Sequence, residues 1–276
     1  MRVFLIDGSG YIFRAYHALP PLTRPSDGLP VGAVHGFCQM LWKLLQDTRE
    51  TGEPTHFAVI FDAARKTFRS DIYPEYKAHR PPAPEDLVPQ FEYIRKAVDA
   101  FGLPRIELDG YEADDIIATY ARQTVADGGE AVIVSSDKDL MQLLSPGVTM
   151  FDSMKNKVIG PDEVMAKFGV GPDRVIDVQS LAGDSSDNVP GVPGIGVKTA
   201  ALLIEQFGDL DQLLAGAETI KQKKRRENLI EFAEQARISR ELVTLCTEVP
   251  DLMPLEKLSL KETEEEPILK FLAEME

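Results

Sequence analysis

Nine acidic side chains fall into short clusters along the sequence, and together they suggest metal-dependent chemistry. They are Asp7, Asp62, Glu112, Asp114, Asp115, Asp137, Asp139, Asp184 and Asp187. Each cluster taken alone has a structural explanation, because acidic residues cap helix N-termini and favour them electrostatically. If the clusters meet in the fold, their charges repel, and each buried ion costs several kcal/mol without compensation. Bound cations would remove that cost.

The ligand type indicates which cations these would be. Oxygen ligands without histidine or cysteine favour Mg²⁺ or Mn²⁺ over Zn²⁺. A carboxylate site of this size suits two metal ions roughly 3.5–4 Å apart, which activate a bound water and stabilise both the attacking and the leaving oxygen of a phosphoryl displacement. The clusters therefore favour a two-metal phosphodiesterase over purely structural acids.

Short apolar runs must position these residues. Val3–Ile6, Phe57–Phe61 and Ala131–Val134 predict buried strands, and an aspartate follows each of them, the first within a turn over residues 7–10. Between the strands, the spacing of apolar residues predicts helices over 33–50, 85–101 and 113–127. This alternation predicts an α/β fold with a parallel sheet covered on both faces. Ligands bind such sheets beyond the carboxyl ends of the strands, where these aspartates lie.

A basic, aromatic and proline-rich segment over 65–84 interrupts this pattern and predicts an excursion above the sheet. Lys77 and Arg80 would share one face if the segment is helical, and could then orient a phosphodiester over the metal ions. Tyr76 could stack on an unpaired base, which is worth about 1–3 kcal/mol. An ordinary basic surface loop is the alternative.

The carboxyl-terminal part of the sequence turns helical after about residue 175. A hairpin rich in glycine and proline over 184–199 precedes predicted helices at 200–207, 209–216 and 226–246. Exposed N–H groups where the hairpin meets the next helix would bind phosphate, and Lys198 would add an ionic contact. Contacts to backbone phosphates alone imply DNA binding without sequence preference. A plain connection between helices remains the alternative.

Composition limits the class of protein. The 276 residues are 43% hydrophobic and 27% charged, which is typical of a soluble folded chain, and no apolar run approaches the roughly 20 residues of a membrane helix. Two cysteines without a ligand spacing indicate free thiols in a reducing cytoplasm. The net charge of −15 argues against a nucleic-acid partner at face value. However, the clustered carboxylates and the acidic tail from residue 248 onward account for all of it, so the net charge excludes little.

Several motifs, in order, carry a family resemblance. The chain resembles the bacterial 5′-nuclease (flap endonuclease) family over roughly residues 2–250, and most closely the amino-terminal 5′→3′ exonuclease domains of the DNA polymerase I type. The motifs are Leu5–Tyr11 with Arg14–His17, Phe68–Arg69 with Tyr76–Arg80, Glu112–Asp115, Ser136–Asp139 and Gly183–Gly191.

The resemblance implies a division of the chain. Residues 1–174 would form a Rossmann-like (PIN- or resolvase-like) parallel-sheet core with a helical arch at about 65–84. Residues 175–250 would form a DNA-binding module of the helix–hairpin–helix (H3TH) type. Residues 251–276 would be an acidic linker toward a C-terminal domain that the sequence lacks, unless the protein is a free-standing nuclease.

The resemblance also implies roles for single residues. Asp7, Asp62, Glu112 and Asp114 match a first metal site. Asp137, Asp139 and Asp187, with Asp114 or Asp115 shared and Asp184 close by, match a second. Lys77, Arg80, Asp114 and Asp137 would be the catalytic residues. DNA would contact Lys77 and Arg80 of the arch together with Arg69, Tyr76, Gly194, Gly196, Lys198 and Thr199, and backbone oxygens of Val192 and Ile195 would bind K⁺.

The implied activity is that of a structure-specific 5′→3′ exonuclease and flap endonuclease in DNA replication and repair. Its substrates would be DNA with a 5′ flap, nick or gap and RNA primers, and its cofactors two Mg²⁺ or Mn²⁺ ions. The protein would be a bacterial cytoplasmic monomer acting at the nucleoid, with polymerase domains joined at its C-terminus. The alternatives are a PIN-like ribonuclease, a non-catalytic DNA-binding module of the same fold, and a small-molecule phosphatase, which would leave the hairpin unexplained.

Overall fold

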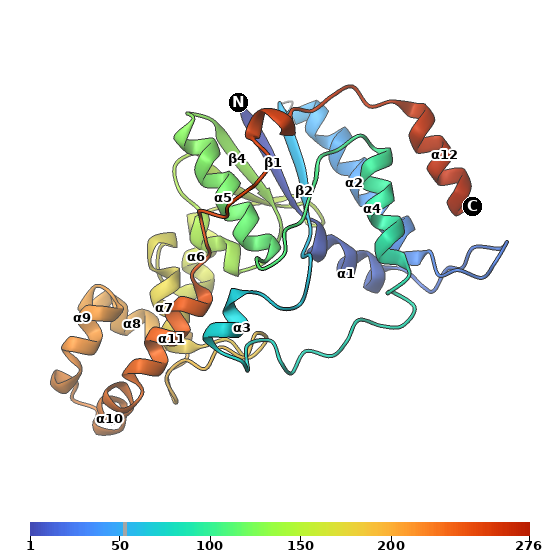
Figure 1. Cartoon of the computed structure of the whole chain (residues 1–276). Coiled ribbons are helices and arrows are strands. Elements are labelled where there is room, and N and C mark those ends of the chain that lie inside the picture. Colours follow the sequence, from blue (N-terminus) through green and yellow to red (C-terminus); the bar gives the residue numbers. More distant parts are fainter. Residues whose placement is uncertain (52–53) are drawn as a thin grey trace.

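The computed structural model describes residues 1–51 and 54–276 and contains one six-stranded sheet (Figure 1). The strands follow the order β3-β2-β1-β4-β5-β6, and all neighbours are parallel except β5 and β6. The strands are β1 (Arg2–Asp7), β2 (His56–Ile60), β3 (Arg105–Ile106), β4 (Glu130–Val134), β5 (Val148–Asp152) and β6 (Lys157–Ile159). The predicted parallel α/β sheet is confirmed, with β1, β2 and β4 as its central strands.

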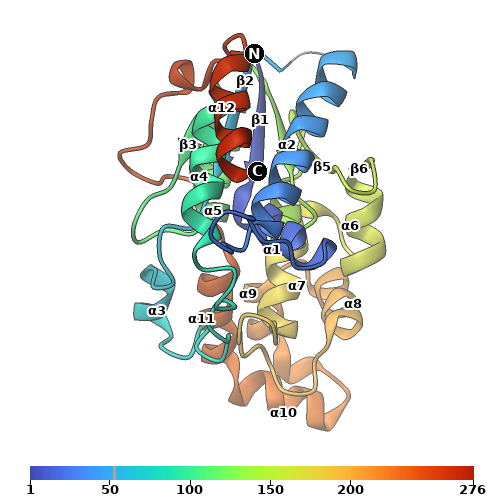
Figure 2. The ribbon, with the colours of Figure 1, turned by 90° about the vertical axis from the view of Figure 1, so that its right-hand side faces the viewer.

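Both faces of the sheet are buried, which explains why its central strands are apolar throughout. In β1, Val3 and Leu5 belong to one hydrophobic cluster, whereas Phe4 and Ile6 belong to a second. Helices α1, α2, α4 and α12 cover the second cluster, and α5 covers the first (Figure 2). The bounds are α1 (Gly8–Ala18), α2 (Gly32–Thr51), α4 (Gln90–Ala100), α5 (Ala113–Ala126) and α12 (Glu265–Met275).

The predicted turn over residues 7–10 is wrong, because the chain enters α1 directly from β1. The Asp7 carboxylate caps the helix by accepting a hydrogen bond of 2.7 Å from the Gly10 N–H. Glycine is required at two positions in the first turn of this helix, Gly8 and Gly10. A Cβ atom at Gly8 would lie 2.6 Å from the Phe61 ring, and one at Gly10 would lie 2.4 Å from the Asp7 carboxylate.

The segment over 65–84 contains one short helix, α3 (Phe68–Ile72), followed by turns. Lys77 and Arg80 therefore do not share a helical face. Lys77 instead adopts a left-handed backbone conformation with a φ of 53°, which is uncommon for a residue with a side chain. Hydrogen bonds to the neighbouring loop fix the turn, including one of 2.8 Å from the Lys77 N–H to the Asp187 carbonyl.

The carboxyl-terminal helices pack against the sheet through the same hydrophobic cluster as α5. The predicted helix over 226–246 is wrong in extent, because it is divided at Phe232 into α10 (Lys223–Glu231) and α11 (Ala233–Val243). None of the helices in the described residues is long and apolar enough to cross a membrane. Besides α10 and α11, the helices of this carboxyl-terminal part are α6 (Pro161–Phe168), α7 (Val175–Ala182), α8 (Val197–Phe207) and α9 (Leu210–Ala215). Short 3-10 helices lie at Asp139–Leu143, Pro172–Arg174, Ala217–Thr219 and Leu255–Leu258.

The acidic tail runs from the face of the sheet that α5 covers to the opposite face, where it ends in α12 (Figure 2). Leu255 and Leu258 are buried in the first cluster. In α12, Ile268, Phe271 and Met275 are buried against the second cluster, beside α4. One apolar face of the tail therefore packs against the core, whereas Leu269 and Leu272 remain exposed.

We expect this packing to contribute to stability. Phe271 is 6% exposed, so Phe271→Ala should lower the free energy of unfolding by about 2–4 kcal/mol. Leu269, on the same helix, is 62% exposed, and Leu269→Ala should change it by less than about 0.5 kcal/mol. Urea denaturation of both variants measures the difference, and equal effects would show that α12 is not packed in solution.

Candidate active site

The aspartates that follow the central strands lie together at the carboxyl edge of the sheet. Asp7 accepts a hydrogen bond of 2.9 Å from the Ser135 hydroxyl, which also accepts one of 3.0 Å from the Asp137 N–H. Asp62, after β2, accepts a bond of 2.8 Å from the Ala113 N–H at the start of α5. The topology therefore brings β1, β2, β4 and the first turn of α5 to one site, as the sequence predicted.

Burial and repulsion between neighbouring carboxylates raise the pKa of two of these acids. Burial raises the pKa of Asp7 to about 6, and the charges of Asp137 and Asp62 add to the effect. Burial also raises the pKa of Asp114 well above its usual value, and repulsion from Asp137, Asp7 and Asp62 contributes. Each of these acids is easier to ionise when a cation is near. The site is thus electrostatically prepared for positive charge.

Five of the clustered carboxylates line a narrow cavity of about 20 Å³. That volume is close to what one water molecule or ion occupies. Its lining brings together acids from α5, from the loop after β4 and from the loop after α7. They are Glu112, Asp114, Asp139, Asp184 and Asp187.

Two basic residues of the segment over 65–84 reach this cavity. The Lys77 Nζ lies 2.8 Å from a carboxylate oxygen of Glu112 and 3.5 Å from one of Asp187. The Arg80 guanidinium forms an ion pair with Asp187. Although burial alone would lower it, the charge of Glu112 raises the pKa of Lys77 overall. The protein's own cations thus neutralise part of the acidic cluster.

Lys138 has the same role for two other acids that line the cavity. It forms ion pairs with Asp184 and, at 3.2 Å, with Asp139. Asp139 also accepts a hydrogen bond of 2.5 Å from the Gln179 side chain on α7. Burial, followed by the charge of Asp137, raises the pKa of Asp139. Neither Lys138 nor Gln179 was among the site residues predicted from the sequence, although Lys138 lies between two predicted ligands.

Asp115 and Arg69 lie elsewhere than expected. The Asp115 carboxylate is fully buried, does not line the cavity, and forms bonds of 2.7 and 2.8 Å with the Arg69 guanidinium. Arg69 is 1% exposed and presents no surface to DNA in this conformation; it lines the narrow cavity, where its guanidinium lies 3.7 Å from the Glu112 carboxylate. Tyr76, expected to stack on a base, is also buried, and its hydroxyl group donates to Glu112 at 3.2 Å. In this conformation Asp114, rather than Asp115, faces the other acids.

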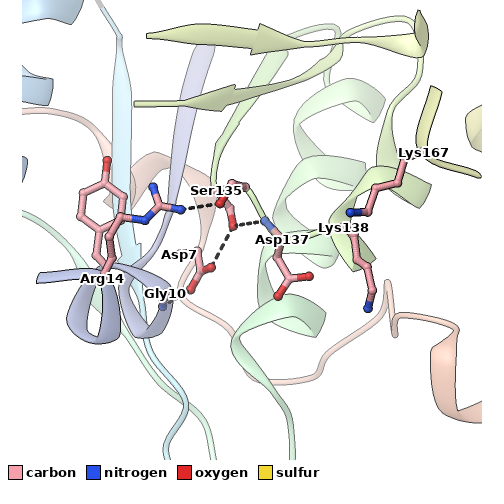
Figure 3. Close-up of a pocket in the computed structure, with 9 residues that line it drawn as sticks. Asp7, Gly10, Arg14, Ser135, Asp137, Lys138 and Lys167 are labelled. Carbon is pink, nitrogen blue, oxygen red and sulfur yellow. Dashed lines mark hydrogen bonds between the residues drawn. The ribbon is translucent and has the colours of Figure 1, made fainter. Parts of the chain in front are cut away.

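Figure 3 shows a larger pocket of about 370 Å³ beside Asp7 and Asp137. In this view Asp7 and Asp137 lie between Arg14 of α1 on one side and Lys138 and Lys167 of α6 on the other. Arg14 also donates to the Ser136 hydroxyl and lies 3.5 Å from Asp152. Sequence reasoning missed Lys167 because it did not predict β6 or α6, which carry this residue to the pocket. Acids flanked by bases in one pocket suit a metal ion and a phosphate together.

The hairpin between α7 and α8 presents exposed residues that a large ligand could contact. Gly194, Gly196 and Lys198 are exposed, and no atom lies within 4 Å of a Cβ atom placed at Gly196. Thr199 is half-buried. Val192 and Ile195 are buried, and the Val192 carbonyl accepts a hydrogen bond of 3.1 Å from the Ile195 N–H.

The donor set fits hard divalent cations in type, because all the clustered ligands are carboxylate oxygens. Among the described residues, however, no three acidic, histidine or cysteine side chains already surround one point as metal ligands. Ion pairs explain this, because four of the carboxylates are already paired with Lys77 or Lys138. Metal ions would therefore bind with a rearrangement of side chains.

Comparison with known protein families covers most of the chain. Residues 2–169 match the model of the 5′-3′ exonuclease N-terminal resolvase-like domain. Residues 170–266 match the model of the 5′-3′ exonuclease C-terminal SAM fold. The core and the helical module are thus the two parts of one family architecture.

Individual relatives agree. The chain is 59% identical to DNA polymerase I of Rhizobium leguminosarum, of which it spans 27%, with all of the chain covered. It is 36% identical to a 5′-3′ exonuclease of Aquifex aeolicus, with 99% of the chain and 92% of the relative covered. The chain therefore spans about a quarter of the polymerase and nearly all of the exonuclease.

Among solved structures, the bacteriophage T5 D15 flap endonuclease, in a complex with DNA and metal ions, has a similar fold. The TM-score is 0.73 at 21% identity, over 99% of this chain and 98% of the phage protein. The likeness to the phage structure concerns the fold, whereas the two family models and the Aquifex relative establish that the chain belongs to the 5′-3′ exonuclease family and is a nuclease.

Proposed function

We propose that the chain is a metal-dependent, structure-specific 5′ nuclease that hydrolyses DNA near the junction of a 5′ single strand with duplex. The observation that carries the proposal is the pair of neighbouring cavities. Acids from β1, β4, α5 and the loop after α7 line them, and Lys77, Arg80, Arg14 and Lys167 lie around them. Such a site can hold divalent cations and a phosphodiester together.

The proposed ligands form two sets, and each set draws on residues of both cavities. Asp7, Asp62, Glu112 and Asp114 would hold one Mg²⁺ or Mn²⁺ ion, and Asp137, Asp139, Asp184 and Asp187 would hold the other. The metal ions would supply an activated water and charge stabilisation at the phosphate. Lys77 and Arg80 would leave their carboxylate partners and orient the phosphodiester, and Arg14 would bind a neighbouring phosphate.

The exposed hairpin would bind the duplex part of the substrate. Gly194, Gly196, Lys198 and Thr199 present backbone and side-chain donors at the start of α8, which suits contact with backbone phosphates. Carbonyl oxygens of Val192 and Ile195 are the proposed ligands of a K⁺ ion there. Residues 1–174 would then be the nuclease core, 175–250 the DNA-binding module and 251–276 the connection to any further domain.

The names of the relatives support DNA as the substrate and a position at the amino-terminal end of a polymerase. Substrates would include 5′ flaps, nicks, gaps and RNA primers in bacterial replication and repair, in the cytoplasm at the nucleoid, with the chain acting as a monomer. Cleavage of a 5′-labelled flap, of blunt duplex and of single-stranded RNA, with Mg²⁺ or with chelator, tests this. Metal-dependent cuts at the flap junction are expected, whereas RNA cleavage regardless of a junction would favour a ribonuclease.

Asp137 should be essential for cleavage. Asp137→Ala should abolish flap cleavage while leaving DNA binding measurable, because it removes a metal ligand but leaves the hairpin intact. Asp162→Ala, at an exposed aspartate of α6, is the matched control and should cleave normally. Full activity of Asp137→Ala under single-turnover conditions would rule out the metal assignment.

Lys77 should act on the chemical step. Lys77→Ala should slow single-turnover cleavage by about 100-fold, because it removes a cation from the reacting phosphate, with little change in duplex affinity. Lys66, on the same segment, has an exposed side chain 3.9 Å from Asp71, and Lys66→Ala should keep the wild-type rate. A wild-type rate for Lys77→Ala would exclude this lysine from the mechanism.

Without metal, the acidic cluster should cost stability at high pH. The pKa of Asp7 is raised from its ordinary value of 3.8 to about 6 in the folded chain, so stability falls as pH rises between these values and the loss is complete above 6. In chelator, Asp7→Asn should therefore gain about 1–3 kcal/mol in free energy of unfolding over wild type on going from pH 4.5 to pH 8. Urea denaturation at both pH values measures this, and a gain that is independent of pH would contradict it.

A further inference from the structure

Five consecutive residues at the end of α11 and directly after it, Leu242–Cys246, join the helical module to the nuclease core, and we call them the module strap. Their backbone groups bond to side chains from three elements of the core. Gln142, in the turn that begins at Asp139, donates to the Val243 carbonyl at 2.9 Å and accepts from the Leu245 N–H at 3.1 Å. Thr119 of α5 donates to the Cys246 carbonyl at 3.3 Å.

Arg69 of α3 makes two further bonds to the strap and connects them to α5. Its Nε donates to the Leu242 carbonyl at 2.8 Å, and one terminal nitrogen donates to the Thr244 carbonyl at 3.1 Å. The same guanidinium binds both carboxylate oxygens of Asp115. The side chain is buried, and its guanidinium lies 4.6 Å from the centre of the Phe68 ring. Only the planar fork of an arginine can serve these partners at once.

Asp115 continues the connection toward the acidic cavities. It accepts hydrogen bonds from the Cys246 N–H at 2.8 Å and from the Glu112 N–H at 3.0 Å. Glu112 and Asp114, which line the narrow cavity, are therefore attached to a carboxylate that Arg69 and the strap hold in place. Gln142 connects the same strap to the turn that carries Asp139.

We propose that Arg69 is a positioning residue that couples the module to the carboxylates, so that duplex bound at the hairpin sets the geometry of the metal ligands. The proposal rests on the proposed function and deepens it. Arg69 contacts neither DNA nor metal in this mechanism. It acts through Asp115 on Glu112 and Asp114, with its guanidinium also 3.7 Å from the Glu112 carboxylate, and through the module strap on α11.

The informative variant is Arg69→Lys, which keeps the charge but loses the fork. Single-turnover cleavage of a flap should fall by about 100-fold, because small displacements of catalytic groups are costly. The Kd for the same DNA, measured in Ca²⁺ without cleavage, should change less than about threefold. Hydrogen exchange at the Leu245 and Cys246 amides should become faster. Arg122→Gln, at an exposed arginine of α5 that pairs with Glu248, should match wild type in all three measurements.

A second variant covers the case in which Arg69→Lys does not fold. Gln142→Leu removes the other set of strap bonds without a change of charge, and it should show the same pattern with a smaller loss of rate. Weakened DNA binding in Arg69→Lys with unchanged exchange at the strap would overturn the proposal in favour of a DNA contact. A wild-type rate in both variants would also overturn it. Absence of cleavage by the wild-type chain would instead reject the proposed function, while the exchange measurement would still test the link.

Discussion

Repulsion among carboxylates at one edge of the sheet is the constraint on which the rest of the structure depends. A parallel sheet places the ends of β1, β2 and β4 side by side, and α5 adds its first turn to the same edge. Without counter-charge the cluster would oppose folding, as the raised pKa values of Asp7 and Asp114 indicate. The fold meets this with Lys77, Arg80 and Lys138, each from a segment without regular secondary structure. Basic side chains on loops can move away from the carboxylates with little change in the rest of the fold, whereas side chains on a strand of the sheet could not.

Sequence reasoning predicted the architecture well because the strongest signals were local. A short apolar run that ends at an aspartate specifies both a buried strand and the acid at its carboxyl end. The strands β3 and β6 were missed because two or three residues carry no period, and α6 was missed with them. The strand β5 was also missed, because its residues alternate in burial and do not form a continuous apolar run. The direct entry from β1 into α1 was missed because glycines usually mark turns, while here they permit close packing against Phe61 and Asp7.

Within the site, residue types could be predicted but not the directions of side chains. Asp114 and Asp115 are neighbours in the sequence, and only the rotation along α5 separates the acid that faces the cavity from the one that binds Arg69. Arg69 and Tyr76 looked like DNA-binding residues because basic and aromatic side chains in a loop usually are exposed. Their burial results from contacts with α5 and the strap, which lie far away in sequence.

The apolar cluster that runs from the sheet into the helical module has an evolutionary consequence. Although two family models divide the chain near residue 170, Leu203, Leu229 and Ala236 of the module belong to the same cluster as Leu5 and Ile133 of the sheet. A chain severed there would expose apolar surface on both halves. The module therefore cannot be exchanged between proteins as an independent unit. A substitution in the shared apolar cluster on one side of the boundary requires a residue of compatible size on the other side.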